Sequence, residues 1–173
     1  MRTRELFISL VFSFGVILTY GQVKLETQLG GSNYLGMTLN AAYDLPLSKD
    51  SNQLITPTLG IGVAAPFWYE RTCILHAGLN YSYKRIGIGS ELSWFTGNPI
   101  YSGQDYQPEK LMVIYPNINI AIVKKRHWYF RLSGGAYFAF SKEYNYENEK
   151  HSLRFEGDVI PGLGITLGYK FSH

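Results

Sequence analysis

The sequence predicts an all-β protein, an eight-stranded antiparallel transmembrane up-and-down β-barrel, from three observations. Apolar residues alternate with small or polar residues along eight segments of the chain, and a β-strand sends successive side chains to opposite faces. Connections of hairpin length join most of these segments, and no stretch after residue 21 is long and apolar enough for a membrane-spanning helix. One of the two faces is rich in glycine and carries charges of both signs.

The first 21 residues have the parts of a secretory signal peptide. Arg2 and Arg4 precede an apolar stretch over residues 6–18, and Thr19-Tyr20-Gly21 supplies small residues before a cleavage site. The apolar stretch is shorter than the roughly 20 residues that a spanning helix requires. We therefore expect a signal peptide over residues 1–21 and a barrel domain over residues 22–173. An uncleaved membrane anchor is the alternative interpretation.

The composition excludes several classes of function. The formal net charge is +3 and is evenly scattered, which is too weak a pattern for binding nucleic acid. Cys73 is the single cysteine, so an internal disulfide is impossible, and it falls on an apolar strand face where a thiol acts as a small hydrophobe. The four histidines have no close same-face spacing, so we predict neither a metal site nor a cofactor.

The alternation continues through the whole chain after residue 21. In the first run Leu25 faces one way, while Lys24 and Glu26 face the other way. The segment Gly30-Gly31-Ser32-Asn33 separates this run from the second. The eight runs, in chain order, cover residues 23–29, 35–45, 58–65, 72–83, 86–94, 112–122, 128–141 and 159–171.

The connections between the runs fall into a short and a long class. The polar turn 46–53, the pair Lys84-Arg85 and the basic stretch 124–127 are short, whereas the polar segments 96–110 and 142–152 are long. If both termini lie on one side of a membrane, the three short turns lie on that side too. We then expect 96–110 and 142–152 to be external loops.

Two prolines interrupt the regular pattern. Pro116 and Pro161 fall inside predicted strands, yet proline has no N–H for the ladder of hydrogen bonds. We expect both at bulges or near a rim of the barrel. A barrel of ten strands, in which the long external loops extend into a hairpin, is the alternative to eight.

The glycine-rich face indicates which side of the sheet is inside. A soluble barrel of the lipocalin type keeps its large apolar residues inside, and a membrane barrel reverses this polarity. Glycine on a solvent face weakens a strand, whereas glycine inside a narrow ring makes room for larger groups. We therefore place the charged face inside, as an interior polar network. Its predicted members are Lys24, Glu26, His76, Asn80, Glu91, Arg131 and Lys170.

The last run carries a resemblance to a known family. Leu163 and Leu167 alternate with glycines, and the strand ends in Tyr169 and Phe171. Together with the signal peptide and the eight runs, this ending resembles the small outer-membrane barrel family that includes OmpX and the membrane domain of OmpA. The resemblance implies that Tyr169 and Phe171 form the C-terminal signal read by the barrel-assembly machinery. It also implies a monomer that sits in outer-membrane lipid. The two residues after the terminal aromatic, 172–173, depart from the family pattern.

The same features predict a non-enzymatic role in the bacterial outer membrane. We expect envelope structure or surface interaction with an extracellular or envelope partner through the loops 96–110 and 142–152. A lipid A acylhydrolase is the enzymatic alternative, since that family places a serine two residues after a histidine. Here His151 and Ser152 are adjacent and fall on opposite faces of a strand, and no His-x-Ser occurs. A soluble lipocalin-like carrier is the third hypothesis.

Overall fold

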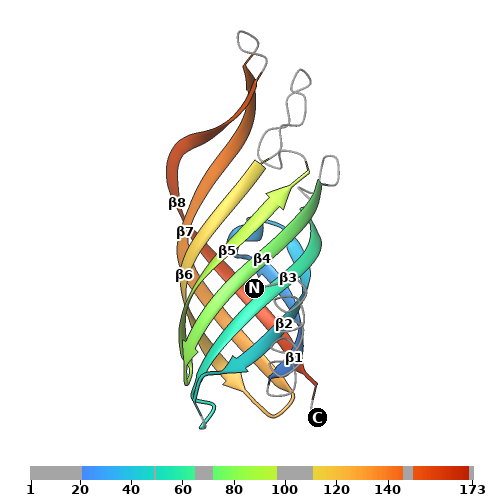
Figure 1. Ribbon diagram of the computed structural model, residues 1–173, viewed down its shortest axis with the longest axis vertical. Coiled ribbons are helices and arrows are strands. Elements are labelled where there is room, and N and C mark those ends of the chain that lie inside the picture. The colour runs from blue at the N-terminus through green and yellow to red at the C-terminus, as the bar shows by residue number, and fades with distance from the viewer. Residues whose placement is uncertain (1–20, 49, 65–71, 97–110, 146–149, 172–173) are drawn as a thin grey trace, which may run out of the picture.

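The computed structural model describes residues 21–48, 50–64, 72–96, 111–145 and 150–171, and these form a closed barrel of eight strands (Figure 1). Each strand pairs antiparallel with the next in sequence, and the first pairs with the last. The predicted eight-stranded antiparallel up-and-down barrel is confirmed. The strands are β1 (Gln22–Gly30), β2 (Met37–Pro46), β3 (Gln53–Ala64), β4 (Thr72–Tyr83), β5 (Ile86–Phe95), β6 (Leu111–Lys124), β7 (Trp128–Asn145) and β8 (Lys150–Lys170).

The two faces of the sheet differ in the way the alternation predicts. In β1 the side chains of Lys24, Glu26 and Gln28 are buried inside the ring, whereas Leu25 and Leu29 at alternate positions are exposed on its outer surface. In β8 the same pattern leaves Leu163 80% exposed. Side chains therefore cover the outside of the barrel with hydrocarbon, which reverses the usual arrangement of a water-soluble protein.

The interior is divided along the barrel axis into a polar part and an apolar part. A cluster of buried apolar side chains fills the lumen at the end away from the start of β1 and the end of β8. Its members are Ala64, Ile74, Phe95, Leu111, Val113, Tyr115 and Tyr137. The expected small or polar interior face thus describes only the part of the lumen nearer the start of β1 and the end of β8. Apolar side chains pack together at the other end because eight strands leave a ring narrow enough for side chains to fill.

The three short turns predicted from the sequence lie at the end of the barrel that holds the C-terminus (Figure 1). They separate β2 from β3, β4 from β5, and β6 from β7. Residues 97–110, which hold nearly all of the first predicted external loop, lie outside the described residues. No helix within the described ranges is long and apolar enough to cross a membrane.

The prediction of a loop over residues 142–152 is wrong for most of that segment. β7 and β8 continue as a paired ribbon beyond the other strands, with Lys142 opposite Leu153 and Asn145 opposite Lys150 (Figure 1). Only residues 146–149 between them lie outside the described part. The sequence of the ribbon lacks a regular alternation of apolar and polar residues, so its composition looked like that of a loop.

The two prolines have different surroundings. Pro116 lies within β6, opposite Ser90 and without a register shift, so the expected bulge or rim position is wrong for it. Pro161 lies in β8 opposite Ala136, just beyond Gly164, the last residue of β8 that pairs with β1. Pro161 thus lies where the ring ends and the ribbon begins. The missing N–H of proline costs less stability there, because this part of β8 is no longer paired with β1.

Candidate functional site

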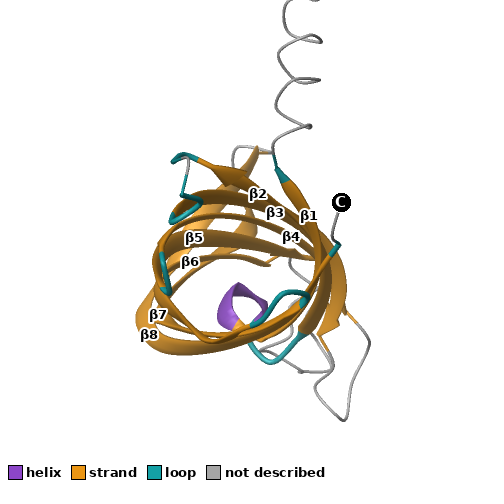
Figure 2. Ribbon diagram, turned by 90° about the horizontal axis from the view of Figure 1, so that it is seen from below, coloured by secondary structure: helices purple, strands orange, loops and turns teal. Residues whose placement is uncertain are grey.

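The connection between β1 and β2 folds into the barrel instead of away from it. It forms a short 3-10 helix, η1 (Gly31–Asn33), whose three residues are all buried, and Figure 2 shows this turn inside the ring of strands. Gly30 and Gly31 have φ angles of 71° and 60°, a conformation that glycine adopts without the strain that other residues meet. The pair of glycines therefore allows the chain to turn sharply into the lumen.

Ser32 of η1 lies at the centre of a buried hydrogen-bond network. Its hydroxyl oxygen lies 3.1 Å from Nδ1 of His76 on β4 and 2.8 Å from the hydroxyl oxygen of Ser93 on β5. Ser93 in turn donates a hydrogen bond of 2.8 Å to the side-chain oxygen of Asn33. These bonds join η1 to two strands that lie 44 and 61 residues further along the chain, and they fix η1 against the barrel wall.

Glu91 on β5 joins η1 to β1 and to β6. Its carboxylate accepts hydrogen bonds from Nε2 of Gln28 at 2.6 Å, from the backbone N–H of Ser32 at 3.3 Å, and from Nδ2 of Asn117 at 3.4 Å. No cation forms an ion pair with this carboxylate among the described residues. Glu91 is therefore held by neutral donors, and one of them belongs to η1.

Asn80 belongs to a short ladder of amides that reaches Glu91. Nδ2 of Asn119 donates to Oδ1 of Asn80 at 2.6 Å and to Oδ1 of Asn117 at 3.1 Å. Asn117 donates to Glu91. The predicted interior residues His76, Asn80 and Glu91 are thus linked, but only through Ser32, Asn117 and Asn119.

A separate ionic cluster surrounds Glu26, which is fully buried. Nζ of Lys24 lies 3.4 Å from this carboxylate and 2.6 Å from that of Asp44, and the guanidinium of Arg131 lies 3.5 Å from Glu26. The hydroxyl of Tyr129 donates a further hydrogen bond to Glu26. Two cations and two carboxylates therefore balance each other within the lumen.

Gly168 explains how Tyr129 reaches Glu26 from two strands away. Gly168 of β8 lies opposite Glu26 of β1 on one side and opposite Tyr129 of β7 on the other. A Cβ atom at Gly168 would run into the ring of Tyr129. The missing side chain lets the phenol cross β8 and bond to the carboxylate.

The remaining predicted residues lie at the end of the barrel where β8 ends. Lys170 is half-buried, and its Nζ lies 5.6 Å from the centre of the Tyr129 ring. Tyr169 points outward, where its ring packs edge-on against Trp128 at 5.0 Å and against Phe171 at 5.3 Å. The backbone N–H of Phe171 donates to Val23, so this residue is held to β1 at the closing seam.

Alternation alone does not identify several of the residues that complete these clusters. For Asp44 and Tyr129 the sequence offered one hint, because they fall on the inward face of their strands, as Lys24 and Arg131 do. That shared face does not show which inward residues contact each other. Gln28 and Ser93 share that face as well. Ser32 carried no periodic signal, because it lies in a connection, and only the preceding Gly30-Gly31 hinted at an unusual turn.

The pairing of Ser32 with His76 has the distance of a nucleophile and its base. Ser32 has no exposed surface, however, and His76 is also buried. A substrate would reach the Ser32 hydroxyl only if η1 left the lumen. Within the described ranges, no group of three His, Cys, Asp or Glu side chains is placed to hold a metal ion.

Substitution of Gly31 by alanine is expected to destabilise the barrel by about 1–3 kcal/mol. A Cβ atom there would lie 2.6 Å from Nε2 of Gln28 and 2.8 Å from Oε2 of Glu91, and φ is 60°. Urea unfolding followed by tryptophan fluorescence measures the change. Gly134→Ala is the matched control, because its Cβ would meet only Leu163 at 3.8 Å. Equal stabilities of the two variants would contradict the packing of η1 described above.

A comparison with protein-family models, with curated proteins and with solved structures finds no match for this chain. The proposed function therefore rests on the fold and the interior clusters alone.

Proposed function

We propose that this protein is an integral barrel of the bacterial outer membrane with a non-enzymatic role in envelope structure or surface interaction. The polarity of the wall carries the proposal. Leu59, Ile61, Ile118 and Leu163 are among many large apolar side chains that face outward and are more than half exposed. Apolar patches of this extent are rare on soluble monomers, whereas a barrel in lipid requires an apolar band around its outside.

Aromatic side chains support the same proposal. Tyr81 and Tyr83 lie outward at the end of β4, and Trp128 and Phe171 lie outward at the same end of the barrel, next to Tyr169. Trp94 lies outward near the opposite end of β5. Tyrosine and tryptophan favour the two interfaces between lipid and water, so aromatic residues at both ends fit a membrane-spanning wall.

The filled lumen favours a structural role over conduction. η1 occupies the ring, the apolar cluster with Phe95 and Tyr115 lies at one end, and the ionic cluster around Glu26 lies at the other. An eight-stranded ring leaves only enough space for such side chains. We expect no stable conductance steps from the purified protein in a planar bilayer.

The ribbon formed by β7 and β8 supports a role in surface interaction. β6 follows β7 only as far as Ser141, and β1 follows β8 only from Gly164 onward. Within the described residues, the outer part of the ribbon therefore has unpaired backbone edges on both sides. Exposed strand edges pair readily with a further strand, so an envelope or extracellular partner with an extended segment fits this ribbon.

The two alternative functions have less support. A soluble carrier of the lipocalin type needs an apolar cavity and a polar exterior, but this lumen holds ion pairs and the exterior is apolar. A lipid A acylhydrolase needs a serine and a base that reach lipid. The buried Ser32 and His76 face the lumen, and the side chains of His151 and Ser152 lie outside the described set.

Heat-modifiable migration tests the proposal. Membranes from cells that express the full chain are extracted, and unheated and boiled samples are compared on a detergent gel. We expect the protein in the outer-membrane fraction, with faster migration before boiling, because a closed barrel stays compact in the detergent. Recovery as a soluble periplasmic protein would refute the proposal. An altered lipid A acyl pattern in mass spectra would favour the enzyme instead.

Replacement of Phe171 by alanine is expected to reduce the amount of protein in the outer membrane several-fold, because the proposed assembly signal loses its terminal aromatic. Purified protein should still fold in detergent or vesicles, since this folding needs no assembly machinery. Trp128→Ala is the matched control, because Trp128 packs in the same aromatic cluster but lies at the start of β7. Equal losses in both variants would indicate a general effect on stability and would contradict the signal.

A further inference from the structure

A cavity of about 50 Å³ lies inside the mouth of the barrel, at the end where β1 begins and β8 ends. Asp44 supplies the single carboxylate among the residues that line it, and the lining is otherwise strongly basic. The cationic side chains in the lining are Lys24, Lys84, Arg85, Lys124, Arg131 and Lys170. Positive charge therefore converges on this space from four strands and one turn.

The two innermost cations already have partners. Lys24 pairs with Asp44 at 2.6 Å and with Glu26 at 3.4 Å, and Arg131 pairs with Glu26 at 3.5 Å. These two carboxylates balance these two cations. The Glu26 cluster therefore closes the inner end of the cavity without neutralising anything nearer the mouth.

The other four cations have no carboxylate partner among the residues that the structure describes. Nζ of Lys124 donates at 3.2 Å to the backbone carbonyl of Lys84, which ties the β6 end to the turn before β5. Lys170 approaches the same space from β8, with its Nζ near the Tyr129 ring. Like charges gathered around one cavity repel each other, so a bound anion would relieve this repulsion.

The size of the cavity limits the ligand. A cavity needs about 10–15 Å³ of such space for one water molecule, so this one accommodates a group of a few heavy atoms. The chemistry favours a tetrahedral oxyanion, because a guanidinium fork and ammonium groups bind phosphate oxygens through charge-assisted hydrogen bonds. The hydroxyl of Ser82 also lines the cavity and provides a neutral donor.

We propose that this cavity is a binding site for a phosphate group, held chiefly by Arg85, Lys124 and Lys170. The phosphate comes either from free inorganic phosphate or from the headgroup of a phospholipid. The site is independent of the role proposed above, because binding can be measured on the folded full chain in detergent.

Titration of inorganic phosphate into the folded protein, followed by calorimetry at low ionic strength in a phosphate-free uncharged detergent, tests the site. We expect saturable binding by the wild-type protein. The double variant R85Q/K170Q should bind on the order of tenfold more weakly or worse, since a hydrogen bond to a charged group contributes strongly. Heat-modifiable migration of each variant shows that the barrel is folded, so a binding defect is distinguished from a failure of the barrel itself.

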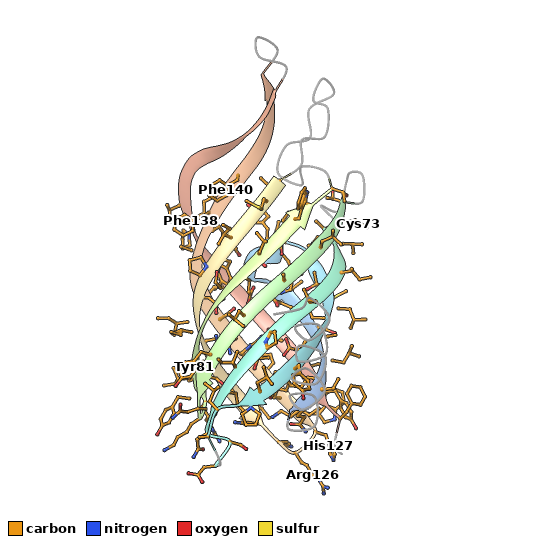
Figure 3. All side chains as sticks on the ribbon, in the orientation of Figure 1. Cys73, Tyr81, Arg126, His127, Phe138 and Phe140 are labelled. Carbon is orange, nitrogen blue, oxygen red and sulfur yellow. The ribbon has the colours of Figure 1, made fainter. Side chains whose placement is uncertain are left out.

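The double variant K125Q/R126Q is the matched control. It removes the same charge at the same end, but neither residue lines the cavity, and Figure 3 shows Arg126 at the tip of the turn, away from the ring. Unchanged affinity in this control, with weakened affinity in R85Q/K170Q, supports the site. Equal weakening in both would indicate diffuse attraction by the basic end and would overturn the proposal.

A second probe, monomeric lysophosphatidic acid, distinguishes the two sources of phosphate. Binding of inorganic phosphate assigns the site to a soluble anion, whereas binding of the lysolipid alone assigns it to a headgroup. Either result must depend on Arg85 and Lys170 to support the proposal. Failure of the wild-type protein to bind both probes would overturn it.

Discussion

Leu59→Arg is expected to reduce the stability of the folded barrel in phospholipid vesicles by about 2–4 kcal/mol. Leu59 lies near the middle of β3, opposite Ala41 and Ala77, and its outward side chain is 68% exposed. If the wall spans a bilayer, the guanidinium is placed in hydrocarbon. Urea unfolding in vesicles, followed by the gel shift of the folded form, measures the loss.

The same substitution also discriminates a membrane barrel from a soluble one. At an exposed position in water, a change of this kind alters stability by about 0.5 kcal/mol or less. Asn52→Arg is the control. Asn52 is exposed in the turn before β3, so an arginine there adds the same charge outside the wall. A large loss for Leu59→Arg and none for Asn52→Arg would support the membrane. Small effects for both would contradict it.

Glu26→Gln is expected to destabilise the barrel by about 3–5 kcal/mol, the usual cost of leaving a buried charge without its partner. Arg131, whose side chain is only 12% exposed, loses its carboxylate, whereas Lys24 retains Asp44. Tyr129 also loses the stronger acceptor. Denaturant unfolding of the variant, compared with the wild-type protein under identical lipid conditions, measures the difference.

A double-mutant cycle isolates the ion pair. Arg131→Gln on its own leaves Glu26 with Lys24, and the double variant removes both charges, so the two effects should fall short of additivity by about 0.5–3 kcal/mol. Glu91→Gln is the matched control, since Glu91 is held by neutral donors and should cost less. If the stability losses of the two single substitutions add up in the double variant, the contact between Glu26 and Arg131 at 3.5 Å contributes no coupling energy.

Alternation predicted the strands and their faces because the two-residue period is a property of the extended backbone itself. The prediction of strands was wrong or incomplete where apolar and polar residues do not alternate in the sequence. Residues 142–145 and 150–152 continue the ladder beyond the last residue of β7 that pairs with β6, and their sequence lacks apolar alternation. The turn η1 has no period at all, and its position depends on partners such as His76, which is far away in the chain.

The sequence pattern also did not predict which residues make up each interior cluster. Alternation places Glu26 and Arg131 on one face, but the register across three strands decides that they meet. Gly168 was a visible clue, since a small residue between Glu26 and Tyr129 provides space for the Tyr129 ring. The register of the neighbouring strands must be known before one can predict which glycine provides space for which side chain.

The inward position of η1 has a consequence for the order in which the barrel forms. Ser32 contacts His76 and Ser93, which follow it by 44 and 61 residues, and Tyr34 packs on Tyr137 of β7. The first hairpin therefore completes its packing only after strands from the second half of the chain have arrived. Contacts between such distant residues form slowly, because a long loop must close before they stabilise anything. We therefore expect the packing of η1 in the lumen to be a late step of folding.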